Sequence, residues 1–389
     1  MKDFCFQNPT KIIFGRDKEL EVGTETARIS KKILLHYGGG SIKASGLYDR
    51  VVRSLKEAGV AFTELSGVKP NPRLSLVREG IRLCREEGLD FILAVGGGSV
   101  IDSAKAIAAG VPYNGDVWDF YDYKAEVQTA LPIGVVLTIP AAGSESSNSS
   151  VISDEEAQLK RGVTTDHYFP RFAIMNPELT YTLPAYQTAC GTADIMAHIM
   201  ERYFTNTRDV ELSDRLCESA LKTMIHQVPL VLKKPDDYGP RSEIMWTGTI
   251  AHNNLLGMGR EEDWASHMIE HEISAIYDIA HGAGLAIVFP AWMKYVYKND
   301  VARFARFAAK VWNVDYNFHN PEETVLLGIA AITRFFSDIG LPVTLSEIGV
   351  GQEHLEEMAQ KCTGGDQFTV GNFVKLDAKA VHAILKLAL

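Results

Sequence analysis

Hydrophobic and polar positions in the first half of the chain form alternating blocks of strand length and helix length. Apolar runs of strand length lie at residues 31–37, 60–66, 90–98 and 132–140. Amphipathic blocks with helical spacing lie between them, at residues 47–59, 73–88 and 100–110. Strands that alternate with helices in this way are typical of βαβ units, so this half predicts a parallel sheet.

The second half has a different pattern. From Pro184 onward the apolar positions recur with helical spacing, and no segment has the alternation of a strand. The predicted helices cover roughly residues 185–203, 209–233, 237–258, 263–278, 300–312, 320–338 and 378–388. A polar stretch with two prolines, NPELTYTLP, precedes them and is a natural boundary. We therefore predict an α/β domain over residues 1–182 and an all-helical domain over residues 183–389.

Composition and charge narrow the class of protein. Hydrophobic residues make up 46% and charged residues 23% of the chain, as in globular proteins. The formal net charge of −10 argues against nucleic acid or an anionic membrane as the main partner. No apolar stretch reaches the roughly 18 residues of a membrane span. Five scattered cysteines and an N-terminus without a signal-peptide pattern predict a cytoplasmic protein.

The segment AVGGGSVIDSAK, residues 94–105, is a strand followed by glycines and a helix start. Gly97, Gly98 and Ser99 would let backbone N–H groups approach an anion at the helix N-terminus, where a diphosphate fits. The pattern is not GxGxxG, so a tight turn of purely structural use stays open. The spacing of Ser99 and Asp102 also fits a capping box, which would give Asp102 a structural role.

A second glycine turn, YGGGSIKASG at residues 37–46, follows an earlier strand. In dinucleotide-binding folds an acidic residue at such a place usually binds the ribose 2′-hydroxyl of NAD. This chain has Gly38, Gly39 and Ser41 there instead, with Lys43 close by. Small residues and a lysine leave room for a 2′-phosphate, so the turn favours NADP.

Histidines and one aspartate lie at helical spacing in otherwise apolar segments. Asp194 and His198 are four residues apart in GTADIMAHIMERYF, and His267 and His271 are four apart in a second segment that also holds His281. Each pair shares one helix face. A buried carboxylate needs a partner, which could be a cation, an arginine or backbone amides. Two such pairs and a third element can enclose one divalent ion, either Fe²⁺ or Zn²⁺.

A metallopeptidase is an alternative for this segment. His267, Glu270 and His271 fit the H-x-x-E-H pattern, in which two histidines bind zinc and the glutamate activates water. That alternative leaves the glycine turns, the Asp194–His198 pair and His281 without a role. A single histidine on a helix is also more often a packing residue than a ligand.

Taken together, these motifs resemble the iron-containing (group III) alcohol dehydrogenase family, and most of all its butanol dehydrogenase and broad aldehyde reductase branch. The resemblance covers nearly the whole chain, and it rests on these segments: NPTKIIFG, GGGSIKASG, KPNPR, AVGGGSVIDSAK, LTIPAAGSE, DIMAHIMERYF and DWASHMIEHEISAIYDIAHGAGLAIVFPAWM. It implies a Rossmann-like N-terminal domain and an all-α C-terminal domain, the fold shared with dehydroquinate synthase. It also implies a homodimer.

The resemblance implies site residues and a reaction. The metal ligands would be Asp194, His198, His267 and His281, with His271 as a proton relay. The cofactor residues would be Gly97, Gly98, Ser99 and Asp102 at the diphosphate, Gly38, Gly39 and Ser41 at the adenosine ribose with Asn71 nearby, and Thr138, Ser144, Ser147, Val151 and Lys160 along the rest of the channel. The reaction would be metal-assisted hydride transfer between NADP or NAD and a small primary alcohol or aldehyde such as butanol or butanal.

Two alternatives remain open. A glycerol dehydrogenase or a dehydroquinate-synthase-like lyase would use the same scaffold with NAD and a metal. A non-catalytic nucleotide-binding protein would keep the glycine turns and have no working metal site. Turnover of butanal distinguishes the dehydrogenase from both.

Overall fold

A six-stranded parallel sheet is the centre of one of two compact units. The computed structural model describes all 389 residues. Residues 7–183 and 234–253 form the α/β unit, and residues 1–6, 184–233 and 254–389 form the helical unit. The strand order is β1-β8-β5-β4-β2-β3, and every neighbouring pair is parallel. The strands are β1 (Lys11–Phe14), β2 (Lys32–Tyr37), β3 (Ala61–Leu65), β4 (Ile92–Gly96), β5 (Ile133–Leu137) and β8 (Phe172–Met175).

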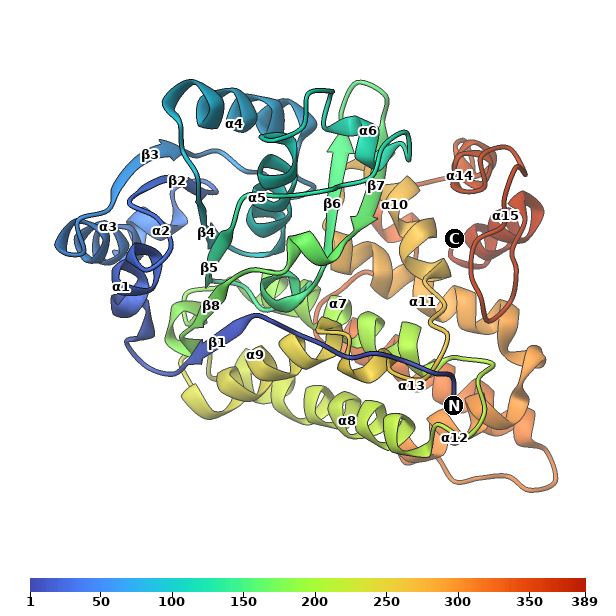
Figure 1. Cartoon of the computed structure of the whole chain (residues 1–389). Helices are drawn as coiled ribbons and strands as arrows, with labels where there is room; N and C mark the ends of the chain where they lie inside the picture. Colours follow the sequence, from blue (N-terminus) through green and yellow to red (C-terminus); the bar gives the residue numbers. More distant parts are fainter. The chain divides into compact units, whose positions relative to one another are not determined.

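Helices cover both faces of this sheet (Figure 1). On β4, Ile92 and Ala94 pack into one apolar cluster while Leu93 and Val95 pack into the other. Both faces of the strand are therefore buried, which explains why its sequence is apolar throughout and does not alternate. The main covering helices are α1 (Val22–Ala27) and α3 (Leu47–Glu57) on one face, and α4 (Leu74–Glu87) and α5 (Gly98–Gly110) on the other.

The α/β unit contains two further parts. An antiparallel hairpin joins β6 (Ser149–Asp154) to β7 (Leu159–Thr164), and the sequence pattern did not predict it. Helix α9 (Tyr238–His252) lies within the expected second domain and packs with this unit. The short elements are η1 (Lys18–Glu21), α2 (Ser41–Ala44), α6 (Trp118–Tyr121), η2 (Ser144–Ser146), η3 (Asp166–Tyr168) and η4 (Pro177–Thr180).

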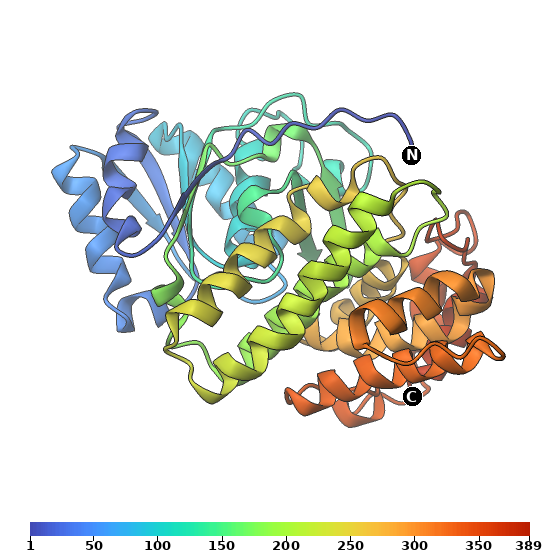
Figure 2. The same cartoon turned by 90° about the horizontal axis from the view of Figure 1, so that it is seen from below.

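The helical unit contains eight longer helices. It contains no strand, as the sequence pattern predicted. Helices α7 and α11 are buried along most of their length and pack against each other. Helices α12 and α13, orange in Figure 2, pack side by side. The longer helices are α7 (Ala185–Tyr203), α8 (Glu211–Lys233), α10 (Ala265–Tyr277), α11 (His281–Val296), α12 (Val301–Trp312), α13 (Pro321–Asp338), α14 (Leu355–Cys362) and α15 (Ala378–Leu387); the 3-10 turns are η5 (Leu255–Gly257), η6 (Tyr297–Asn299) and η7 (Ser346–Ile348).

Helix α11 is the main element that the sequence pattern missed. Its residues are apolar all round, so they show no helical periodicity, and Pro290 lies inside it. Both features hide a helix from an analysis that looks for one apolar face. None of the helices is both long enough and apolar enough to cross a bilayer.

Candidate metal and cofactor sites

Three helices of the helical unit bring the four predicted metal ligands together. Asp194 and His198 lie on α7, His267 lies on α10, and His281 is the first residue of α11. Asp194 Oδ1 lies 3.9 Å from His267 Nε2, 3.8 Å from His281 Nε2 and 3.6 Å from His198 Nδ1. The ligand atoms of Asp194, His267 and His281 all lie within 4.8 Å of one another.

This donor set fits a divalent cation. Ligands about 2.0–2.2 Å from a tetrahedral ion lie roughly 3.4 Å apart, so the separations from Asp194 leave room for one ion. A carboxylate and imidazoles suit Fe²⁺ or Zn²⁺. The ring of His198 stacks on that of His267, with centroids 4.8 Å apart, so the fourth predicted ligand borders the same space. Asp194 is 5% exposed, and a cation beside it would offset the cost of burying its charge.

His271 lies beside this cluster. Its ring centroid is 5.6 Å from that of His281, and it is half-buried. Glu270, His271 and His281 form a second group whose ligand atoms lie within 4.8 Å. The carboxylate of Glu270 is fully buried and accepts hydrogen bonds from His281 Nδ1 and Ser274 Oγ. A carboxylate so engaged is a poor base for water, which disfavours the metallopeptidase alternative.

Glu201 is a buried carboxylate that the sequence analysis missed. It lies seven residues after Asp194 on α7 and has no exposed surface. Its Oε1 accepts from His267 Nδ1 at 2.8 Å and from His267 N at 3.2 Å, and its Oε2 accepts from Trp264 N at 2.6 Å. Burial raises the pKa of Glu201 to about 8, although the backbone hydrogen bonds from Trp264 and His267 oppose the shift. Glu201 lies seven residues after Asp194, so both acids lie on one helix face, and this spacing is the sequence feature that could have identified Glu201.

Close backbone packing fixes the position of His281. A Cβ atom on Gly282 would lie 1.9 Å from the carbonyl oxygen of Cys190 on α7, so only glycine allows this approach. A Cβ atom on Gly284 would lie 2.7 Å from the Glu270 side chain. The sequence His-Gly-Ala-Gly therefore lets the start of α11 lie against both α7 and α10.

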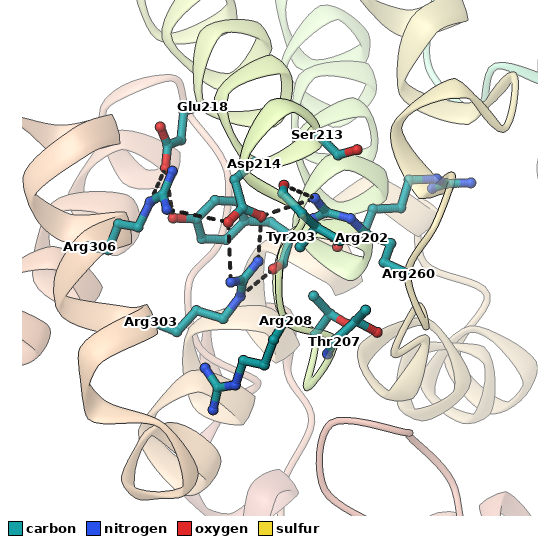
Figure 3. Close-up of polar contacts among 12 residues, drawn as sticks. Arg202, Tyr203, Thr207, Arg208, Ser213, Asp214, Glu218, Arg260, Arg303 and Arg306 are labelled. Atoms are coloured by element: carbon teal, nitrogen blue, oxygen red, sulfur yellow. Dashed lines mark hydrogen bonds and ion pairs between the residues drawn. The ribbon is translucent and has the colours of Figure 1, made fainter. Parts of the chain in front are cut away.

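A group of arginines around Asp214 braces this part of the helical unit (Figure 3). Asp214 Oδ1 lies 2.6 Å from Arg303 Nη2 and 3.0 Å from Arg260 Nη2. Asp214 Oδ2 lies 3.4 Å from Arg306 Nη1, and Arg306 Nε donates to Glu218 at 2.7 Å. Two buried carboxylates on α8 are thus surrounded by guanidinium groups.

Arg202 connects that network to the predicted metal ligands. Its carbonyl oxygen accepts from Arg260 Nη1, and its own Nη1 donates to the carbonyl oxygen of His198 at 2.8 Å. Its guanidinium lies 4.9 Å from the ring of Trp264, and that ring lies edge-on to His198 at 5.8 Å. The network therefore holds the C-terminal end of the helix that carries Asp194 and His198.

In the α/β unit, β4 leads through the predicted diphosphate turn into α5. Gly97 is the N-cap residue, and α5 runs for 13 residues from Gly98. A Cβ atom on Gly98 would lie 2.8 Å from that of Ala142, so this glycine is also required for packing. The N–H groups at the start of α5 lie where the sequence predicts an anion site.

The capping-box alternative for Asp102 is wrong. No side chain caps α5, and Asp102 instead accepts from Ser144 Oγ at 2.5 Å and from Val151 N at 2.9 Å. Burial raises its pKa, against the opposing charge of Lys105. Asp102, Ser144 and Val151, which are three of the predicted cofactor residues, therefore form one hydrogen-bonded group.

Lys105 is a second residue that the sequence analysis missed. It has no exposed surface, and its Nζ donates to the carbonyl oxygens of Ser144, Ser147 and Ser149 at 2.7–3.0 Å. It also reaches the hydroxyls of Ser144 and Ser147. Burial lowers its pKa to about 8. The serine-rich segment thus bends around one buried ammonium group.

The predicted ribose turn follows β2. A Cβ atom on Gly39 would meet nothing within 4 Å, so a larger side chain fits there. Lys43 lies over the rings of Tyr37 and Tyr48, at 5.4 and 4.8 Å. Both tyrosine hydroxyls donate to Glu64, at 2.5 and 2.6 Å. The turn therefore presents a lysine beside open space, with one acid close to it.

The remaining predicted cofactor residues also lie in the α/β unit. Gly38 accepts from Gly67 N next to the ribose turn, and Ser41 begins α2. Asn71 is buried with a positive φ of 54°, and Thr138 N donates to the carbonyl oxygen of Gly96 at 3.1 Å. Lys160 is buried on β7, opposite Ser153 in the hairpin.

Family comparison decides the class of protein. The model of iron-containing alcohol dehydrogenases matches residues 9–177, and the model of the C-terminal region of Fe-containing alcohol dehydrogenases matches residues 188–389. The chain belongs to the iron-containing alcohol dehydrogenase family. The predicted family and fold class are therefore confirmed, and so is the prediction of an alcohol dehydrogenase or aldehyde reductase at the level of this family.

Relatives in this family cover the chain along its length. It is 45% identical over 394 residues to a probable NADH-dependent butanol dehydrogenase 2 of Bacillus subtilis (strain 168), with all of both chains covered. It is 37% identical over 364 residues to the NADPH-dependent aldehyde reductase YqhD of Escherichia coli, with 93% of each chain covered. The crystal structure of NADH-dependent butanol dehydrogenase A from Thermotoga maritima matches with a TM-score of 0.96 and 43% identity, over 100% of this chain and 99% of that one.

Proposed function

We propose that this protein is a metal-dependent, NAD(P)-linked enzyme that interconverts small primary alcohols and aldehydes, such as butanol and butanal. The observation that carries the proposal is the cluster of Asp194, His267 and His281, with His198 beside it, in a chain of the iron-containing alcohol dehydrogenase family. Relatives named as butanol dehydrogenases and as an aldehyde reductase support this substrate class.

Asp194, His198, His267 and His281 would hold the cation, which is Fe²⁺ in this proposal. A divalent cation bound there would act as a Lewis acid toward the carbonyl oxygen of the substrate, and the nicotinamide would supply the hydride. The protein itself would position the cation and shape the space in which the substrate binds. Trp264 stands edge-on to two of the histidine rings, so its indole limits the space beside the cluster.

We propose His271 as the residue that moves the proton. It is half-buried beside His281, and an imidazole can pass a proton between a substrate hydroxyl and solvent near neutral pH. Its role would appear as a loss of kcat in His271→Ala with the bound metal retained.

The cofactor would bind at the two glycine turns, with NADPH preferred over NADH. Open space at Gly39 and the ammonium group of Lys43 support a 2′-phosphate at the ribose turn. The N-terminus of α5 would take the diphosphate, close to the group formed by Asp102, Ser144 and Val151.

The test is reduction of butanal by metal-reconstituted protein, followed as cofactor oxidation with NADPH and NADH in parallel, with and without a chelator. Turnover that the chelator abolishes supports the proposal, and the ratio of the two kcat/KM values tests the cofactor preference. Protein with stoichiometric metal and no turnover of any aldehyde would contradict it.

We also propose a cytoplasmic homodimer, on the resemblance and the scattered free cysteines. Light scattering on the eluting protein should give twice the chain mass, and fractionation should place the activity in the cytoplasm. A monomeric mass, or activity in another compartment, would contradict the corresponding part.

A further inference from the structure

Two fully buried glutamates contact two of the proposed ligand histidines at the ring nitrogen that lies away from Asp194. Glu201 on α7 contacts His267, and Glu270 on α10 contacts His281. In both pairs the carboxylate meets Nδ1 of the imidazole, while Nε2 is the atom that lies within 4 Å of Asp194. The same arrangement therefore occurs twice around one site.

The surroundings of Glu201 fix the direction of its hydrogen bond to His267. One oxygen accepts the backbone N–H of Trp264 at 2.6 Å, and the other accepts that of His267 at 3.2 Å. These two backbone hydrogen bonds favour the ionised carboxylate, which has no proton to donate and therefore accepts from His267 Nδ1. The proton of that imidazole then resides on Nδ1, and the lone pair resides on Nε2.

Glu270 orients His281 in the same way, with a second hydrogen bond from Ser274 Oγ. His281 belongs to two groups that could hold a cation, one with Asp194 and His267 and one with Glu270 and His271. Each nitrogen of the His281 ring faces one of these groups. Nδ1 contacts Glu270, and Nε2 lies 3.8 Å from Asp194 Oδ1 in the other group.

We propose that Glu201 and Glu270 are positioning residues that fix the tautomer and ring orientation of His267 and His281, so that both present the Nε2 lone pair to one cation beside Asp194. The proposal rests on the proposed function, because it assumes a metal in this cluster. Carboxylates in such outer positions raise the basicity of the ligand histidine, and their loss typically weakens metal binding by about 10- to 100-fold.

The experiment measures the Kd for Zn²⁺ by chelator competition in purified full-length protein, for wild type, Glu201→Gln and Glu270→Gln. Each substitution keeps the size of the side chain but replaces one accepting oxygen with an NH₂ group, which cannot accept the hydrogen bonds that the carboxylate accepts. We expect both Kd values to rise about 10- to 100-fold. Glu19→Gln is the matched control, since Glu19 is 2% exposed, bonds to Asn176 and Arg50 in the α/β unit and contacts none of the four proposed ligands; its Kd should stay at the wild-type value.

Two further variants keep the proposal falsifiable if an amide variant fails to fold. Glu201→Asp and Glu270→Asp retain the charge but lose reach, so a positioning role predicts weaker binding and a shifted Co²⁺ absorption spectrum. Wild-type affinity and spectrum in these variants would overturn it.

His271→Ala tests which group of His281 holds the ion. It should bind Zn²⁺ as wild type does, and a loss of binding there would instead assign the ion to the group with Glu270. These readouts need no turnover, so failure of the proposed function appears separately, as wild-type protein that binds no metal or reduces no aldehyde.

Discussion

Acid should destabilise this protein through one buried histidine, His36. Its Nδ1 donates to the carbonyl oxygen of Leu65 at 2.9 Å, and its Nε2 accepts from Ser103 Oγ at 2.9 Å, which joins β2, β3 and α5. The bond from Ser103 requires the neutral ring, because a protonated Nε2 cannot accept it. Burial lowers the pKa of His36 from 6.5 to about 4, with the bond to Leu65 opposing the shift.

The direction and size of this effect on the free energy of unfolding follow from the difference between the folded and unfolded pKa values of His36. Because the folded pKa lies below the unfolded value, the stabilisation is complete above pH 6.5 and is lost as the pH falls toward 4. At about 1.4 kcal/mol per pKa unit, the full loss is about 3 kcal/mol. At pH 5 the loss amounts to about 2 kcal/mol of the free energy of unfolding.

The assay is urea unfolding followed by circular dichroism, near pH 7.5 and near pH 5, for wild type and His36→Gln. Glutamine does not titrate, so the variant should lose about 2 kcal/mol less than wild type between the two conditions, whatever its stability at neutral pH. His226→Gln, which removes an exposed imidazole on α8, is the control and should lose as much as wild type. An equal pH dependence in wild type and His36→Gln would refute the argument.

Three other changes test the remaining sites. His267→Ala should abolish bound metal and butanal reduction together, because it removes a proposed ligand; stoichiometric metal by elemental analysis with a normal rate would exclude that role. Gly39→Asp has room for its side chain and should lower kcat/KM for NADPH relative to NADH, since a carboxylate repels a 2′-phosphate; an unchanged ratio would mean that the ribose lies elsewhere. Asp214→Asn leaves the guanidinium groups of Arg260 and Arg303 without their anion, so urea unfolding should show a loss of about 3–5 kcal/mol, and a loss below about 1 kcal/mol would show that water already screens the pair.

Much of the fold could be predicted from local pattern. The strands β2, β3, β4 and β5 and the helices between them lie within a few residues of their predicted limits, because each is an apolar run or an amphipathic block. The hairpin β6–β7 was missed because serines and charged residues dominate it. Its pairing depends on a partner strand and not on a local apolar pattern.

The site could be predicted only in part, for a similar reason. Helical spacing singled out Asp194, His198 and His267, and the structure brings them together with His281. The partners of these residues come from other helices, so no spacing within one segment identifies Glu201 as the acceptor of His267. Lys105 likewise bonds to serines about 40 residues away, a relation that only the folded chain contains.

The contact between α11 and α7 limits which residues near the proposed metal ligands can be replaced. The atoms that Gly282 approaches on Cys190 belong to the backbone, and the Cys190 side chain is also hydrogen-bonded to the backbone of Ala283, two residues after His281. Cys190 is half-buried one helical turn before Asp194. Selection or design can therefore change residue 190 only to a side chain that leaves the start of α11, and with it His281, in place.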